Sequence, residues 1–178
     1  MSVRMTRRQA LGTLAGAATL AMCPAAAEDR LAGLYQRALV IDGLSFGKEW
    51  KEPELRALKA AGYAGIVESL PRRDLQTAVG ALVQWRRRAA KHSDALMIAL
   101  TASDFERAKR DGRTAVVMNF QNATMLEGNA DNVEVLHALG TRCFQLTYNY
   151  RNRLGDGCLE RTNAGLSEFG IEVVGHMN

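Results

Sequence analysis

Strand-like and helix-like runs alternate along most of the chain, and this alternation restricts the fold more than any other feature of the sequence. The segment 114–120, TAVVMNF, is continuously apolar in its centre, which is typical of a strand covered on both faces. We therefore predict an α/β fold with a parallel sheet. The expected strands are 38–42, 64–69, 96–100, 114–120 and 141–149, and the expected helices are 53–62, 72–92, 102–112, 130–139 and one that starts at Ser167.

The residues after the first expected strand help to decide between a doubly wound sheet and a barrel. They contain no glycine-rich phosphate loop, which disfavours a doubly wound nucleotide-binding sheet. A (β/α) barrel is the better match, and about five β/α units fit within the chain. We therefore expect the N-terminal part of a TIM-barrel-like fold, with its functional residues at the carboxyl ends of the strands.

Residues 1–27 have the pattern of an export signal. Two arginines at 7–8 stand before an apolar run at 10–22. The paired arginines favour the twin-arginine (Tat) route, so we expect a cleaved signal peptide and a periplasmic or extracellular location in a bacterium. A membrane anchor and a lipid on Cys23 are weaker alternatives, because Gly and Ala dilute the run and bulky Met22 precedes the cysteine. After cleavage we expect no stable membrane span.

The charge argues against nucleic-acid binding, and the cysteines and histidines argue against a local zinc motif. The formal net charge of +4 falls to +1 when the three arginines of residues 1–27 are removed (4 − 3 = 1), so we expect no nucleic-acid partner. The basic run at 86–91, RRRAAK, is expected to be a solvent-exposed helix face. Cys143 and Cys158 are interpreted as free thiols, with a disulfide between them as the alternative. The three histidines are scattered and form no zinc motif.

Polar side chains collect where the expected strands end. Gln121 and Asn122 follow the fourth strand, and each offers a donor and an acceptor, which suits an amide or zwitterionic ligand. The plain alternative is that such amides only satisfy backbone groups at the strand ends. The candidate substrate-binding residues are Gln121, Asn122, Tyr148, Asn149, Arg151 and Asn152. Other polar residues expected at the same edge of the sheet are Asp42, Glu68, Ser69 and Asn119.

The loop after the fifth expected strand 141–149 adds two arginines and two acidic residues. Arg151 and Arg153 are candidates to bind a substrate carboxylate, and Asp156 and Glu160 are expected to be turn residues.

Two stretches resemble the renal or membrane dipeptidase family, the M19 metallopeptidases: LEGNADNVEVLHALGTRCFQLTYNYRN at 126–152 and GLSEFGIEVVGHMN at 165–178. The resemblance is strong over 115–178 and weaker but collinear over 34–111. It implies the barrel fold of metallo-dependent hydrolases, two zinc ions as the cofactor, and hydrolysis of dipeptides. A dipeptide or small amide ligand is the partner that it implies.

The chain departs from that family at positions that would hold metal or substrate. The family's Asp-Gly-His-x-Asp appears here as DGLSF, so Leu44 and Phe46 replace two zinc ligands. Gln121 stands where the family has its metal-bridging Glu, and Tyr148 where it has a substrate-binding His. The family's other His ligands correspond to positions beyond Asn178. Two zinc ions need an anionic bridge to offset their repulsion, and an amide supplies only a dipole, so we expect no standard two-zinc site in this chain.

Two interpretations of these replacements remain open. In the first, the complete protein is an exported, zinc-dependent dipeptidase of a divergent branch, and the 178-residue chain is inactive by itself. In the second, the protein is a non-catalytic relative that binds a peptide or an amino acid. The two classes differ in whether a bound dipeptide is cleaved.

The length of the chain bears on its domain organisation. An eight-stranded barrel needs about 250 residues, whereas residues 28–178 number only 151 (178 − 27). We therefore expect residues 28–178 to be an incomplete barrel domain and the chain to be the N-terminal part of a longer protein. A small domain that closes by forming a homodimer is the alternative.

Overall fold

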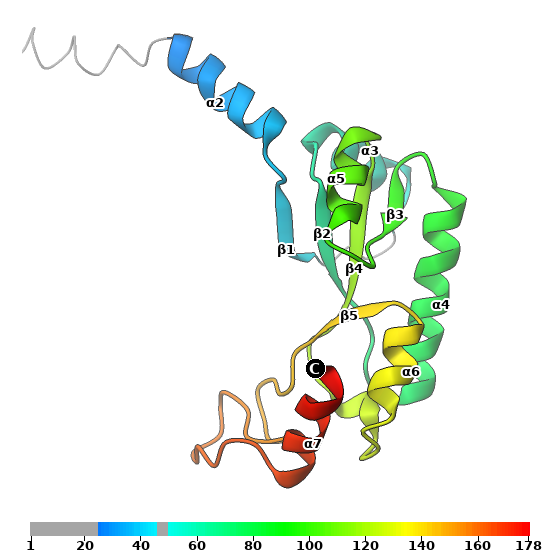
Figure 1. Cartoon of the computed structure of the whole chain (residues 1–178), viewed down its shortest axis with the longest axis vertical. Helices are drawn as coiled ribbons and strands as arrows, with labels where there is room; N and C mark the ends of the chain where they lie inside the picture. Colours follow the sequence, from blue (N-terminus) through cyan, green and yellow to red (C-terminus); the bar gives the residue numbers. More distant parts are fainter. Residues whose placement is uncertain (1–24, 46–49) are drawn as a thin grey trace, which may run out of the picture. The chain divides into compact units, whose positions relative to one another are not determined.

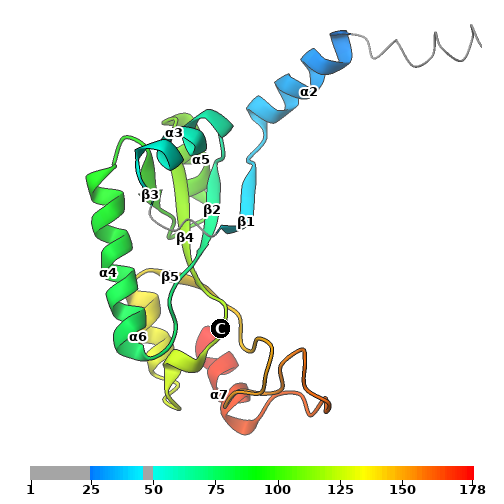
Figure 2. The same ribbon diagram turned by 180° about the vertical axis from the view of Figure 1, so that it is seen from behind.

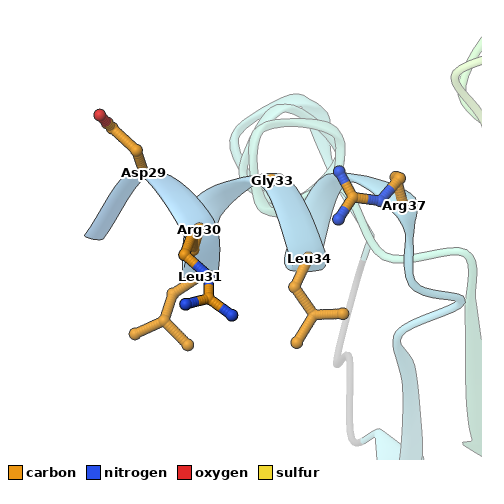
Figure 3. A pocket seen from close by; sticks show the side chains of 6 residues that line it. All are labelled: Asp29, Arg30, Leu31, Gly33, Leu34 and Arg37. Carbon is orange, nitrogen blue, oxygen red and sulfur yellow. The ribbon is translucent and has the colours of Figure 1, made fainter. Parts of the chain in front are cut away.

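The computed structural model describes residues 25–45 and 50–178, and the chain divides into two compact units, 1–38 and 39–178. The first unit contains helix α2 (Ala25–Arg37), which the sequence pattern did not predict. Leu31 and Leu34 point to the same side of this helix (Figure 3), and both are mostly exposed. Most of the expected export signal lies outside the described residues and stays a prediction. In the described ranges, no helix is both long and apolar enough to cross a membrane.

A parallel sheet forms the centre of the second unit (Figure 1). Its order is β1-β2-β4-β3, and β5 also pairs with β4. All of these pairings are parallel, which confirms the predicted α/β fold with a parallel sheet. The strands are β1 (Ile41–Ser45), β2 (Gly65–Ser69), β3 (Leu96–Ile98), β4 (Thr114–Phe120) and β5 (Thr141–Phe144).

Strand β4 is the central strand of this sheet. On one edge β2 pairs with it from Gly65, opposite Ala115, to Ser69, opposite Asn119. On the other edge β3 pairs with the first half of β4, and β5 pairs with its end. Only Val117 in the middle of β4 is not fully buried, as expected for a strand with a continuous apolar pattern. The carboxyl ends of β2, β4 and β5 therefore open at the same edge of the sheet.

Helices α4 and α3 show capping chemistry at one end each. Helix α4 starts after Asp74, whose Oδ1 accepts a hydrogen bond from Thr77 N over 2.7 Å. Helix α3 ends at Gly62, the residue predicted for this role, which has the left-handed φ of 68°. Helix α4 packs beside β3 (Figure 2). The helices of the second unit are α3 (Glu52–Ala61), α4 (Leu75–Lys91), α5 (Ser103–Arg110), the short 3-10 helix η1 (Thr124–Leu126), α6 (Asn132–Ala138) and α7 (Glu168–Met177).

One large apolar core joins the helices to the sheet. Ile66 of β2, Leu82 of α4 and Phe120 of β4 are almost completely buried within it. Trp50 and Trp85 meet edge to face at the border of this core, with ring centroids 5.5 Å apart. Full burial of each large apolar side chain stabilises the fold by about 1.5–3 kcal/mol. The core thus fixes the strand ends that carry the polar residues.

Four of the five strands differ from the sequence-based prediction at a boundary: β2 begins one residue later and β3 ends two residues earlier than expected, and β1 and β5 differ more. The strand expected at 38–42 begins only at Ile41 and continues to Ser45, because pairing with β2 sets Ile41 opposite Gly65. The strand expected to reach 149 ends at Phe144, because the chain after it bonds within its own loop: Cys158 N donates to Tyr148 O over 2.8 Å. The shorter β5 leaves the residues from 145 onward free to form a long loop.

Candidate functional site

Gln121 and Ser69 join the ends of two neighbouring strands. Gln121 directly follows β4, and Ser69 is the last residue of β2. Ser69 Oγ donates a hydrogen bond to Gln121 Oε1 over 3.0 Å, and both side chains are partly buried. The amide nitrogen of Gln121 is not used in this bond, so it remains able to donate to a ligand.

Asn152 connects the loop after β5 with the residues after β4. Its Nδ2 donates to Asn122 Oδ1 and to Leu146 O, each over 2.7 Å. Its Oδ1 accepts from Leu154 N, also over 2.7 Å. These bonds bring Asn122 and Asn152, which lie 30 residues apart, into one amide pair. Asn152 therefore has a structural role, whatever else it contacts.

Arg153 borders a small cavity beside this amide pair. The cavity has a volume of about 200 Å³, and Asn152, Arg153 and Phe169 are among the residues that line it. Arg153 Nη1 donates to Glu127 O over 3.4 Å, which is a long hydrogen bond. A guanidinium has five N–H donors, so Arg153 retains donors for an anionic group in the cavity.

The carboxylate of Glu68 lies near the end of β2 and is only 4% exposed. Trp50 Nε1 donates a hydrogen bond to its Oε1 over 3.3 Å. Asn119, at the end of β4, is also buried, and its carbonyl accepts a hydrogen bond from Leu70 N over 2.8 Å. Sequence reasoning placed Glu68 at the strand ends but did not find its contact with Trp50, because the two residues belong to different segments.

Arg151 and Asp156 form an ion pair inside the long loop. Arg151 Nε lies 2.6 Å from Asp156 Oδ1, and the backbone N of Arg151 donates to Glu160 Oε1 over 2.6 Å. Hydrogen bonds from Ala164 N and the Thr162 hydroxyl lower the pKa of Asp156, so it is ionised at neutral pH. Arg151 and Arg153 both line the cavity beside Asn152, but the Arg151 guanidinium is already paired with Asp156, so Arg153 is the one with more donors left for a ligand.

Tyr148 and Asn149 lie at the start of the same loop. The Arg72 guanidinium lies over the Tyr148 ring, 5.4 Å from its centroid, and the tyrosine is 38% exposed. Asn149 Oδ1 accepts a weak hydrogen bond from Cys158 Sγ over 3.6 Å. Cys143 and Cys158 are both free thiols, as predicted, and burial raises the pKa of Cys143. The loop therefore has no cross-link between these cysteines.

The described residues do not fit a two-zinc centre. Among them, no group of three or more His, Cys, Asp or Glu side chains could hold a metal ion. Leu44, in β1, has an apolar side chain, and Phe46 lies outside the described residues. Gln121 Oε1 is already the acceptor for Ser69 Oγ, and it carries no charge to offset two cations. The side chains that meet around Gln121 are thus amides and a hydroxyl, while the Glu68 carboxylate at the same edge accepts a hydrogen bond from Trp50.

The structure brings some of the predicted site residues together and separates others. Gln121, Asn122 and Asn152 gather at the ends of β4 and β5, and we call these three residues with Ser69 the amide mouth. Arg151 is paired with Asp156 within its own loop, although it also lines the cavity beside Asn152. Ser69 was placed at this edge from the sequence, but its pairing with Gln121 was not. That pairing could have been inferred from the hydroxyl of Ser69 and the amide of Gln121, because these residues lie at the ends of adjacent parallel strands.

The model of the membrane dipeptidase family, peptidase family M19, matches residues 51–178, so the chain belongs to this family. An amidohydrolase from Pseudomonas aeruginosa has a similar structure, with a TM-score of 0.77 and 31% identity over 82% of this chain and 45% of that one. The probable dipeptidase PvdM from Pseudomonas aeruginosa gives a TM-score of 0.66 and 20% identity, over 85% of this chain and 47% of that one. The dipeptidase AC, a metallopeptidase of family M19, gives a TM-score of 0.61 and 19% identity, over 78% of this chain and 53% of that one.

These similarities show which fold the chain has and how much of that fold it covers. The chain has part of the TIM-barrel-like fold of these hydrolases, as the sequence predicted. It spans about half the length of each of the three solved relatives. The predicted resemblance to the M19 family is confirmed by the family match.

Proposed function

We propose that the protein has a dipeptidase-like function and that the described part of the chain supplies a binding mouth for a dipeptide. The single observation that carries this proposal is the amide mouth at the ends of β2, β4 and β5. Membership of the M19 family supports the substrate class. Active sites of barrel enzymes lie at the carboxyl ends of the strands, which is where these side chains gather.

The chemistry of the mouth suits a dipeptide. A dipeptide has one amide group, a positive terminus and a negative terminus, and it needs neutral donors and acceptors next to an anion site. The amide nitrogen of Gln121 is a donor for the peptide carbonyl. Arg153, at the neighbouring cavity, is a bidentate partner for the carboxylate. Together they provide complementary groups for the two acceptors of the ligand.

Hydrolysis is a separate question from binding. The M19 family consists of metallopeptidases, but the donor set described above does not provide the anionic bridge of a two-zinc site. We derive no metal-dependent step from these residues. Binding without cleavage is therefore the function that we assign to residues 25–178 by themselves, and zinc-dependent hydrolysis is assigned to a complete protein with further ligands.

The location of the protein is also part of this proposal. The twin arginine and the apolar run that follows it support export to the periplasm, where peptides are available as ligands. Fractionation of cells that produce the chain with its N-terminus intact tests this assignment. Recovery of the protein in the cytoplasm with residues 1–27 still attached would contradict it.

The function is tested by titrating the purified chain with L-alanyl-D-alanine. Calorimetry measures binding of the dipeptide, and an assay for free alanine, with and without zinc, measures its hydrolysis. We expect saturable binding that is about tenfold weaker in Arg153→Gln, a loss of about 1.4 kcal/mol. Arg161→Gln removes one charge from an exposed position of the same loop and should bind like the unmodified chain. Binding without turnover supports the non-catalytic interpretation, and zinc-dependent release of alanine supports the enzyme. Absence of both contradicts the proposal.

A further inference from the structure

A second cavity lies between the start of α3 and the last turns of α4. Its volume is about 670 Å³, and its lining comes from residues 50–53 on one side and from Arg87, Arg88, Lys91 and His92 on the other. It shares no residue with the amide mouth. We call it the basic cleft, because four of its side chains are cationic at neutral pH and only Glu52 is acidic.

Three cations of the basic cleft have no acidic partner. Within residues 25–45 and 50–178, Arg87, Arg88 and Lys91 form neither an ion pair nor a hydrogen bond through their side chains. The guanidinium of Arg88 lies over the ring of Trp85, 4.7 Å from its centroid, and this contact leaves its N–H donors available. Glu52 pairs with Arg56 over 3.4 Å instead of with these three cations.

The ends of the two helices do not account for this excess of positive charge. The C-terminus of α4 carries the equivalent of about half a negative charge, which favours cations in its last turn. The N-terminus of α3, at the same cleft, carries about half a positive charge and offsets that effect. Three side-chain charges therefore remain without an acidic partner in the described residues, and an anion bound in the cleft would offset their mutual repulsion.

Trp50 forms the wall of the cleft in a strained conformation. Its φ is 50°, in the left-handed region that a bulky side chain rarely adopts, at a cost of about 1–3 kcal/mol. The hydrogen bond from its indole to Glu68 and its edge-to-face contact with Trp85 hold it there. Strain of this kind is typical of ligand sites, and here it shapes an apolar wall beside a row of cations.

We propose that the basic cleft binds a ligand that carries a phosphate group. The two arginines and the lysine that line the cleft match the charge and the acceptor chemistry of a phosphate, which accepts bidentate hydrogen bonds from guanidinium groups and bears up to two negative charges. A single carboxylate would neutralise only one of the three cations. The phosphate is that of a small ester in solution or that of a lipid headgroup, and both present the same chemistry.

The chain provides its own reporter for this test. It contains two tryptophans: Trp50 lines the cleft, and Trp85 packs against Trp50 and lies under the guanidinium of Arg88. We therefore expect that titration with inorganic pyrophosphate, in a buffer without divalent cations, changes the intrinsic tryptophan fluorescence in a saturable way. Isothermal calorimetry of the same titration measures binding independently of the fluorescence.

Two double variants of equal charge separate a site from general attraction. Arg87→Gln with Lys91→Gln removes two charges at the cleft, where both side chains are exposed, and keeps Arg88 on Trp85. Arg110→Gln with Arg161→Gln removes two charges from exposed positions elsewhere. We expect pyrophosphate binding to weaken about tenfold or more in the first variant and to stay unchanged in the second. Equal weakening in both, or no pyrophosphate signal in the unmodified chain by either method, overturns the proposal.

Vesicles identify the source of the phosphate. If the site binds a lipid headgroup, the unmodified chain should sediment with phosphatidylglycerol vesicles but not with phosphatidylcholine vesicles. The cleft variant should then lose this sedimentation. Pyrophosphate binding without sedimentation assigns it to a soluble phosphate ester. In either case the cleft variant should bind L-alanyl-D-alanine like the unmodified chain, so failure of this inference is distinguishable from failure of the proposed function.

Discussion

Asn152 Nδ2 and Asn122 Oδ1 lie 2.7 Å apart, and this hydrogen bond links the loop after β5 to the end of β4. The same side chain bonds to Leu146 O and Leu154 N, so one residue sets the path of the chain on both sides of it. The contact between the long loop and the end of β4 therefore depends on this asparagine.

Replacement of Asn152 by Ala should destabilise the fold. It removes three hydrogen bonds of a partly buried side chain, each contributing about 1 kcal/mol, so we expect a loss of about 2–3 kcal/mol in the free energy of unfolding. Urea denaturation followed by circular dichroism measures the loss. Asn149→Ala is the control, because Asn149 accepts only a weak bond from Cys158, and its effect should stay within about 0.5 kcal/mol. Equal effects of the two changes would contradict the role of Asn152.

Replacement of Gln121 by Glu tests whether one charge is enough to create a metal site. The change places a carboxylate where the family has its bridging Glu, but the described residues contain no existing group of three or more His, Cys, Asp or Glu side chains that it could join. Catalytic zinc needs three protein ligands. We therefore expect calorimetry to show no stoichiometric zinc binding by the variant. Tight binding of one zinc per chain would show that further ligands reach this edge of the sheet.

Two glycines of α7 should respond in opposite directions to replacement by Ala. A Cβ at Gly170 would lie within 3.0 Å of the backbone carbonyl of Leu154, so Gly170→Ala should destabilise the fold by about 1–3 kcal/mol. A Cβ at Gly175 would meet nothing within 4 Å, so Gly175→Ala should stabilise the helix by about 0.5–1 kcal/mol. Thermal unfolding of both variants measures the difference. A stabilising Gly170→Ala would show that α7 does not rest against Leu154.

The cap of α4 should make stability depend on acid pH. Hydrogen bonds from Thr77 and then from Arg73 lower the pKa of Asp74 from 3.8 to about 2. Because the pKa is lower in the folded state, the stabilisation is present above about pH 4 and is lost as the pH falls towards 2. Asp74→Asn keeps an acceptor at the cap but cannot ionise. We expect its melting temperature to lie below that of the unmodified chain at pH 7 and this difference to shrink as the pH falls from 4 through 2; a difference that keeps its full size at pH 2 would contradict this assignment.

Regular segments were predictable from the sequence where a local pattern decides the structure. The strand at 114–120 is found at those residues, because its apolar run has no alternative to burial on both faces. The end of α3 at Gly62 is local too, since only a left-handed residue closes the helix there. The start of β1 was not predictable, because the edge strand is placed by its pairing with β2.

The candidate site was predictable only in its residues and not in its contacts. The polar side chains after each strand follow from the parallel sheet, which brings the carboxyl ends together. The pairing of Asn122 with Asn152 and the ion pair of Arg151 with Asp156 depend on the path of a long loop, which no periodicity describes. The strained Trp50 also has no local signal, since Gly or Asn is the usual residue in that conformation.

The position of β4 between β2 and β3 has a consequence for the chain as it leaves the ribosome. β3 is synthesised before β4, so β3 is the first strand available to the edge of β2 that β4 occupies in the folded sheet. β3 has three residues and β4 has seven, so a mistaken pair between β2 and β3 would gain fewer hydrogen bonds than the correct pair. The shortness of β3 thus keeps such a nascent mispairing weak enough for β4 to displace it when it emerges.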